Sequence, residues 1–411
     1  MYLKKIWNIL GPGMLYAGAA VGVSHLVQST RAGSQYGWTL WWVILFSNFI
    51  KYPFFEFGPR YASATGKCLL SGYKNLGNYA LLIFIVMTIL TMFAIQAAVT
   101  IVTAGLCENA FALNLSAPIW GLILLMTCGL ILVWDNYRLV NKVVKWIIVT
   151  LTGTTIVCLI LARKSTSSNI LSPEFSWLST PDILFVVALM GWMPAPIDLS
   201  IWHSGWSKEK DLTNESKTSL KDQLLDFNVG YMGTALLALC FLGIGATIMH
   251  QSGREFSSSA QGFAKDLIEM FTKTLGLWSY PIIVTAAFCT MLSTTLTLLD
   301  AFPRSLRTAF NLLLNTKPSK KQYNLWLLFT ILGTSLLMFF FMQNMKGMVD
   351  LATTISFVVA PVLAVLNTKA INSPNVPLEF RPSKVLNTHA LIGILFLSIF
   401  SGYFIWLRFF S

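Results

Sequence analysis

The chain has 411 residues, of which 55% are hydrophobic and only 11% are charged. Its mean hydropathy is +0.65, a value that ordinary soluble domains do not reach. The composition therefore excludes a soluble globular protein and predicts a polytopic membrane protein.

The formal net charge is +12 at pH 7. Most Lys and Arg residues fall in every second segment between the apolar stretches, starting with the N-terminal segment. By the positive-inside rule this distribution predicts a cytoplasmic N-terminus, and an odd number of spans then puts the C-terminus outside. The excess charge reflects topology in a cell membrane, expected to be a bacterial inner membrane, and not a nucleic-acid partner.

Stretches of about 20 apolar residues, the length that crosses a bilayer, divide the chain into predicted spans with short connections. Residues 1–411 are therefore expected to form a single transmembrane domain. The eleven predicted spans are 9–31, 38–62, 78–106, 117–134, 143–162, 181–204, 224–250, 277–301, 323–342, 347–368 and 387–407.

Two of these spans contain residues that should interrupt a helix. The first span has Gly22-Val23-Ser24-His25 at its centre, and the sixth has Met193-Pro194-Ala195-Pro196 followed by Asp198. Backbone groups freed in hydrocarbon cost several kcal/mol unless they are satisfied, so such breaks occur where a chain lines a cavity or packs against protein. Paired breaks in two halves of a chain indicate the binding site of a transporter.

The spacing of the breaks predicts the architecture. Four complete spans separate them, as in the leucine-transporter-like fold, where two inverted five-helix units each begin with a broken helix. We expect an all-α integral membrane protein whose first repeat is 8–162 and whose second is 181–368, with 387–407 as an additional helix.

Several short motifs carry a more specific similarity. The motifs are Gly11-Pro12-Gly13, the stretch from Arg31 to Gly37, Arg60 with Thr65-Gly66-Lys67, Ala112-Leu113-Asn114-Leu115 and Met193-Pro194. With these motifs and this span number, the chain resembles the Nramp family of divalent-metal transporters over residues 8 to 368.

The resemblance implies a metal site that this chain only partly keeps. The family's DPGN motif in the first helix falls on Gly22, Val23, Ser24 and His25, so both oxygen ligands, the Asp and the Asn, are replaced. Of the family's ligands only the sulfur of Met193 remains, a ligand type that favours manganese and iron over calcium and magnesium.

The departures continue in other helices. The histidine of the family's MPH motif becomes Ala195, and the acidic pair of the third helix falls on Val102 and Gly105. The glutamine of the tenth helix falls on Thr353. An alternative alignment on His203-Ser204 places Asp198 at the histidine position, and the sequence leaves both alignments open.

We predict that seven residues line the substrate site, and that three of them could bind a metal. His25 could be a metal ligand, a proton carrier or a hydrogen-bond donor, or it could satisfy carbonyls at the break. Asp198 could couple protons or substrate, or it could stabilise a half-helix N-terminus, and Met193 could be a ligand or a filler of the core. The predicted site is Gly22, Ser24, His25, Met193, Ala195, Asp198 and Thr353, with His25, Met193 and Asp198 as the metal candidates.

Charged residues within the spans receive simpler interpretations. Lys51 and Glu56 in the second span are expected to form an internal ion pair, with replacement of a coupling cation by Lys51 as the alternative. Asp300 with Arg304, and Asp135 with Arg138, are expected to pair at the ends of spans.

These features favour a secondary active transporter of a divalent metal ion, working by alternating access. The alternative is the same fold carrying a small organic solute such as an amino-acid-like molecule, since unwound carbonyls and half-helix N-termini bind carboxylate and ammonium groups. A sensor without transport is a third possibility, and no motif of an enzyme is present. The expected partners are the cargo and the lipid bilayer, without a cofactor, and the sequence predicts no oligomeric state.

Overall fold

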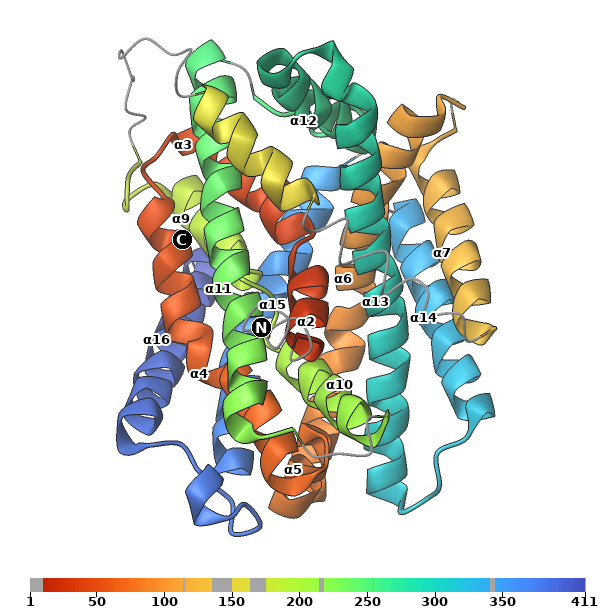
Figure 1. The fold of residues 1–411 in the computed structure, drawn as a ribbon, viewed down its shortest axis with the longest axis vertical. Coiled ribbons are helices and arrows are strands. Elements are labelled where there is room, and N and C mark those ends of the chain that lie inside the picture. Colours follow the sequence, from red (N-terminus) through yellow and green to blue (C-terminus); the bar gives the residue numbers. More distant parts are fainter. Residues whose placement is uncertain are drawn as a thin grey trace, which may run out of the picture.

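The computed structural model describes residues 10–113, 115–134, 150–162, 175–213, 218–253, 255–340 and 344–410, and no β-strand occurs among them. Most of the long helices run along the long axis of the molecule, and α5 (Leu69–Leu76) and α12 (Ala260–Leu275) lie at opposite ends (Figure 1). The others are α2 (Pro12–Ala20), α3 (Thr30–Tyr36), α4 (Trp41–Thr65), α6 (Asn78–Phe111), α7 (Ala117–Val133), Thr150–Ala162, α9 (Thr180–Gly191), α10 (Leu199–Thr213), α11 (Leu220–Ile244), α13 (Tyr280–Leu314), α14 (Lys320–Phe340), α15 (Met345–Ile371) and α16 (Lys384–Phe410).

Each predicted span coincides with a helix or a broken helix in the described part of the chain. By length and composition alone, six described segments could cross a membrane: Asn78–Phe111, Leu220–Ser252, Leu277–Leu314, Lys320–Phe340, Met345–Ile371 and Lys384–Phe409. The first and sixth predicted spans are divided into shorter helices, and Ala117–Val133 and Thr150–Ala162 are short apolar helices. Charged residues lower the hydropathy of α4. Residues 143–149 of the fifth predicted span, and the Asp135–Arg138 pair, lie outside the described residues.

The outer surface of the bundle is apolar, as a lipid-facing surface must be. On α14, Leu325, Leu328, Leu332 and Leu336 are all more than half exposed, and their spacing of three and four residues places them on one face of the helix. The opposite face packs against α6, α7 and α13. An exposed apolar stripe of this length would be unfavourable in water and is stabilised by lipid.

Both predicted helix breaks are present. α2 ends at Ala20, and the chain continues as a π-helical turn, Ser24–Ser29, into α3. α9 ends at Gly191 and α10 begins at Leu199. The boundaries of the two repeats, 8–162 and 181–368, stay a prediction, as does the separate status of 387–407, the region of α16.

Candidate functional site

A small cavity of about 20 Å³ lies between the two breaks. This is room for about one water molecule. Its walls come from the end of α2, from α6, from the break after α9 and from α13. The lining residues are Ala19, Ala20, Gly22, Val23, Ser24, Ile95, Val99, Trp192, Ala195, Pro196, Thr294 and Leu298.

The break in the first helix is satisfied by hydroxyl groups. Ser24 Oγ donates to the carbonyl of Ala20 at 2.7 Å. Thr294 Oγ1 on α13 lies 3.4 Å from the carbonyls of both Gly18 and Val21, and 3.1 Å from the Thr290 carbonyl of its own helix. The carbonyls of Gly18, Ala20 and Val21 are among the last carbonyls of α2, which have no partner within the helix. The same two hydroxyls are polar groups of the cavity wall.

Gly22 fits tightly against α13. A Cβ atom at Gly22 would lie 3.0 Å from both Oγ1 and Cγ2 of Thr294. The aspartate that the Nramp resemblance implies here would therefore fit only if Thr294 moved, which gives a physical reason for the small residue at this position.

His25 uses both of its ring nitrogens. Nε2 lies 2.9 Å from the carbonyl oxygen of Thr234 on α11, which can only accept, so Nε2 carries a proton. Nδ1 lies 2.6 Å from Ser24 Oγ. The single hydroxyl proton of Ser24 can point to the Ala20 carbonyl, with Nδ1 then donating, or to Nδ1 itself. The same heavy-atom contacts therefore accommodate the ring with one proton or with two.

The break in the sixth helix is satisfied by the amino group of Lys51 on α4. Lys51 is fully buried, and its Nζ donates to the carbonyls of Met190 and Gly191, the latter at 2.9 Å. Ser47, one turn earlier on α4, donates to the carbonyl of Met193 at 2.7 Å. The C-terminal carbonyls of α9 are thus bound by two side chains of one neighbouring helix.

The predicted ion pair between Lys51 and Glu56 is wrong. The Glu56 carboxylate instead accepts hydrogen bonds from Nε and Nη2 of Arg60 at 3.0 and 2.6 Å. Residues four apart lie on one face of a helix and residues five apart do not, so Glu56 faces Arg60. The predicted pair of Asp300 and Arg304, which are four apart, is confirmed at 2.9 Å.

Asp198 lies just before α10 and is 5% exposed. Its carbonyl accepts from the backbone N–H groups of Ile201 and Trp202, which places its carboxylate at the positive end of that half-helix. Tyr73 on α5 is near enough to interact with it electrostatically. Asp198 is not among the residues that line the small cavity.

Met193 and Thr353 lie behind the cavity wall. Met193 is fully buried and is not a lining residue. Thr353 on α15 accepts from Gln28 Nε2 at 3.4 Å and donates to the carbonyl of Val349. The Thr353 carbonyl oxygen lies only 2.0 Å from where a Cβ of Gly191 would be. Only glycine allows α9 and α15 to approach this closely.

Of the seven predicted site residues, three line the cavity: Gly22, Ser24 and Ala195. No hydrogen bond or ion pair joins His25, Met193 or Asp198 to one another among the described residues. Within these ranges there is also no group of three or more His, Cys, Asp and Glu side chains that could hold a metal ion.

Two larger cavities lie on either side of the small one. A cavity of 620 Å³ is lined by residues 181–185 of the sixth helix and by Arg31 and Asp350, whose ion pair of 2.7 Å joins α3 to α15. A cavity of 390 Å³ is lined by residues 201–212 and, on α13, 301–312. The three cavities therefore follow one another along the sixth helix, with the break in the middle.

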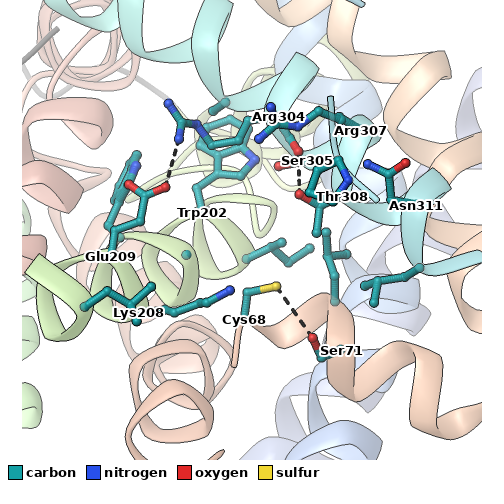
Figure 2. Close-up of a pocket in the computed structure, with 18 of the residues that line it drawn as sticks. Cys68, Ser71, Trp202, Lys208, Glu209, Arg304, Ser305, Arg307, Thr308 and Asn311 are labelled. Atoms are coloured by element: carbon teal, nitrogen blue, oxygen red, sulfur yellow. Dashed lines mark hydrogen bonds and ion pairs between the residues drawn. The ribbon is translucent and has the colours of Figure 1, made fainter. Parts of the chain in front are cut away.

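Figure 2 shows the 390 Å³ cavity between α5, α10 and α13. Glu209 of α10 and Arg304 of α13 form an ion pair of 2.8 Å at one side, and Trp202 stands between these elements. Trp202 also packs edge-on against Phe302, with ring centroids 5.1 Å apart. Trp202 thus contributes both to the wall of this cavity and to the packing of α10 against α13.

A helical membrane bundle with two broken helices around a central cavity is the architecture of the leucine-transporter-like transporters. The model of the family described as "Natural resistance-associated macrophage protein-like", or Nramp, matches residues 13–407. The chain belongs to the Nramp family, and is a multi-pass membrane transport protein and not an enzyme.

The similar proteins agree with this assignment. Protein PM0681 of Pasteurella multocida is 35% identical over 98% of this chain and 94% of its own length. The divalent metal cation transporter MntH of Agrobacterium fabrum is 26% identical over 61% of this chain and 56% of its own.

Two solved structures share the fold. The manganese transporter of Eremococcus coleocola has a TM-score of 0.72 at 12% identity, covering 98% of this chain and 86% of that one. MhsT in complex with L-phenylalanine has a TM-score of 0.64 at 14% identity, covering 97% and 98%. The leucine-transporter-like fold expected from the sequence is confirmed.

Sequence reasoning missed Thr234, Thr294 and Ser47. Each is a hydroxyl residue in an apolar helix, and such residues usually bond to their own helix, as Thr234 Oγ1 does to Tyr231. Their positions relative to the breaks depend on tertiary packing, so no local pattern identifies them.

Proposed function

We propose that this chain is a secondary active transporter that moves a divalent transition-metal ion, of the manganese and iron class, through the small cavity by alternating access. The size of that cavity carries the proposal. Its 20 Å³ matches one ion or one water, whereas an amino-acid-like solute needs several times this space. The names of MntH, a divalent metal cation transporter, and of the Eremococcus manganese transporter support the same class of cargo.

The route runs through the three cavities in order. The ion pair of Arg31 with Asp350 closes one side, and the cavity of 390 Å³ provides the opening on the other. The proposal includes the repeats 8–162 and 181–368, a cytoplasmic N-terminus, an external C-terminus and the bacterial inner membrane. The asymmetric distribution of Lys and Arg supports this orientation.

His25 and Ser24 supply a means of proton coupling. The pair can hold one proton more or less with the same contacts, next to a cavity that Ser24 lines. In this proposal Ser24 and the break carbonyls are the groups nearest to the cargo. If His25 binds the metal together with Met193 and Asp198, one of its ring nitrogens must first lose its contact with Ser24 or Thr234.

A second candidate is transport of a small organic solute by the same fold. It is favoured by the charges near the breaks. No acidic side chain lines the small cavity, and a buried lysine, Lys51, binds the carbonyls at the end of α9. A divalent cation normally receives at least one carboxylate. The fold likeness to MhsT agrees with either cargo.

Uptake into proteoliposomes tests the proposal. We expect Mn²⁺ to enter vesicles that contain the parent protein, under an inward proton gradient. Ala195→Leu, which adds bulk to the cavity wall, should reduce uptake to the level of protein-free vesicles. Gly233→Leu is the matched control, because Gly233 has no neighbouring atom within 4 Å of its Cβ position. Failure of Mn²⁺ and Fe²⁺ uptake, with accumulation of an organic solute, would establish the second candidate instead.

A further inference from the structure

The amino group of Lys51 is bound at the C-terminal end of a half-helix in the middle of the bundle. Its two described partners are the carbonyls of Met190 and Gly191. No acidic side chain pairs with Lys51 among the described residues, because Glu56 is held by Arg60. A buried lysine is usually paired with a carboxylate, so this arrangement requires a different explanation.

The end of α9 is a site that attracts a cation. The last carbonyls of a helix lack partners within it and form the negative end of the helix dipole. In membrane transporters, half-helix C-termini and unwound carbonyls coordinate monovalent cations at this kind of break. Ser47 adds a hydroxyl oxygen 3.4 Å from the Met190 carbonyl and 2.7 Å from that of Met193.

We propose that the carbonyls of Met190 and Gly191 form a monovalent-cation seat, with Ser47 Oγ beside the Met190 carbonyl, and that the Lys51 ammonium is the tethered occupant of this seat. The seat is filled in every molecule, so no free cation binds there. Removal of the side chain creates a site for ammonium, methylammonium or an alkali-metal ion. The inference does not depend on the identity of the cargo.

The break in the first helix shows why the tether matters. Its carbonyls bind the neutral hydroxyls of Ser24 and Thr294, which a cargo ion can replace. The carbonyls after α9 are already bound to a positive charge, which repels a second cation. The Lys51 ammonium thus makes the end of α9 positive, so a cation binds preferentially on the side of Ser24 and Thr294.

Thermal unfolding of the purified full chain tests this inference. The melting temperature is measured in equal concentrations of choline, sodium, potassium, ammonium and methylammonium chloride. We expect Lys51→Ala to melt at least about 2 °C lower than the parent in choline, and to recover in one of the small cations. The parent and Lys265→Ala, whose side chain is 68% exposed, should not distinguish these salts.

A second variant separates charge from space. Lys51→Met keeps most of the side-chain volume, so it should be destabilised and should recover in none of the salts. The inference is overturned if folded Lys51→Ala is indifferent to every cation, if Lys51→Met is as stable as the parent, or if Lys51→Ala cannot be purified folded even in methylammonium. All of these measurements report stability, so their outcome does not depend on whether the protein takes up a metal ion.

Discussion

The two broken helices produce the same signal in the sequence but are stabilised by different chemistry. In the first helix, the carbonyls freed at the end of α2 meet the hydroxyls of Ser24 and Thr294. In the sixth, those at the end of α9 meet the amino group of Lys51. A hydroxyl can be exchanged for a ligand, whereas the amino group of Lys51 is tethered at its break. The two halves of the site are therefore unequal, and in our proposal the first helix is the side where the cargo cation binds.

The largest loss of stability is expected from adding a side chain at Gly191, where α9 packs closely against α15. In Gly191→Ala the new Cβ would overlap the Thr353 carbonyl, only 2.0 Å away, and would push α9 from α15 and from Lys51. We expect a loss of at least about 3 kcal/mol in unfolding free energy, the upper end for overpacking. Gly233→Ala, whose added methyl group meets no neighbour, should unfold like the parent. Chemical denaturation in detergent measures both, and equal stability would show that this contact does not position α9.

A smaller loss is expected when only the charge at this break is removed. In Lys51→Met the Gly191 carbonyl loses its side-chain donor, while that of Met190 keeps the N–H of Met193 at 3.3 Å. One buried unpaired carbonyl costs about 2 kcal/mol. The exposed Lys265→Met should change stability by less than about 0.5 kcal/mol. Similar unfolding curves for the two variants would show that the Lys51 amino group does not stabilise the second break.

The first break should tolerate change more readily. Thr294→Val removes a hydroxyl that lies 3.1 Å from the Thr290 carbonyl of its own helix and 3.4 Å from the carbonyls of Gly18 and Val21, so the expected loss is about 1 kcal/mol. Mn²⁺ uptake should fall more than stability does, because Thr294 also lines the cavity. Thr330→Val is the control, since Thr330 donates only to Trp326 of its own helix. Unchanged uptake by Thr294→Val would place the cargo elsewhere.

The fold was accessible from the sequence because membrane physics acts on local patterns. Span length, the glycine at position 22 and the prolines at 194 and 196 follow from the thickness of lipid and the cost of freed backbone groups. The partners of the breaks were not accessible in this way. Lys51 binds carbonyls 139 and 140 positions away, while the nearest opposite charge in the sequence, Glu56, lies on another face of α4. Periodicity indicates which face a residue occupies, but not which helix packs against it.

A similarly small effect on stability is expected at Ser24, the residue of the first break that we propose takes part in proton transfer. Ser24→Ala removes the partner of His25 Nδ1 but leaves Nε2 bound to Thr234. Stability should fall by about 1 kcal/mol, because His25 Nδ1 loses its partner while the Ala20 carbonyl keeps the N–H of Gly22 at 3.0 Å. The acidification of the vesicle interior that accompanies Mn²⁺ uptake should be lost. Ser29→Ala is a matched control, because Ser29 is equally buried and donates to the Ser24 carbonyl without touching the ring. A pH-sensitive dye inside the vesicles reports the proton movement. If Ser24→Ala still acidifies the interior with each ion, the exchangeable hydroxyl of the first break serves the cargo alone, and the proton follows another path.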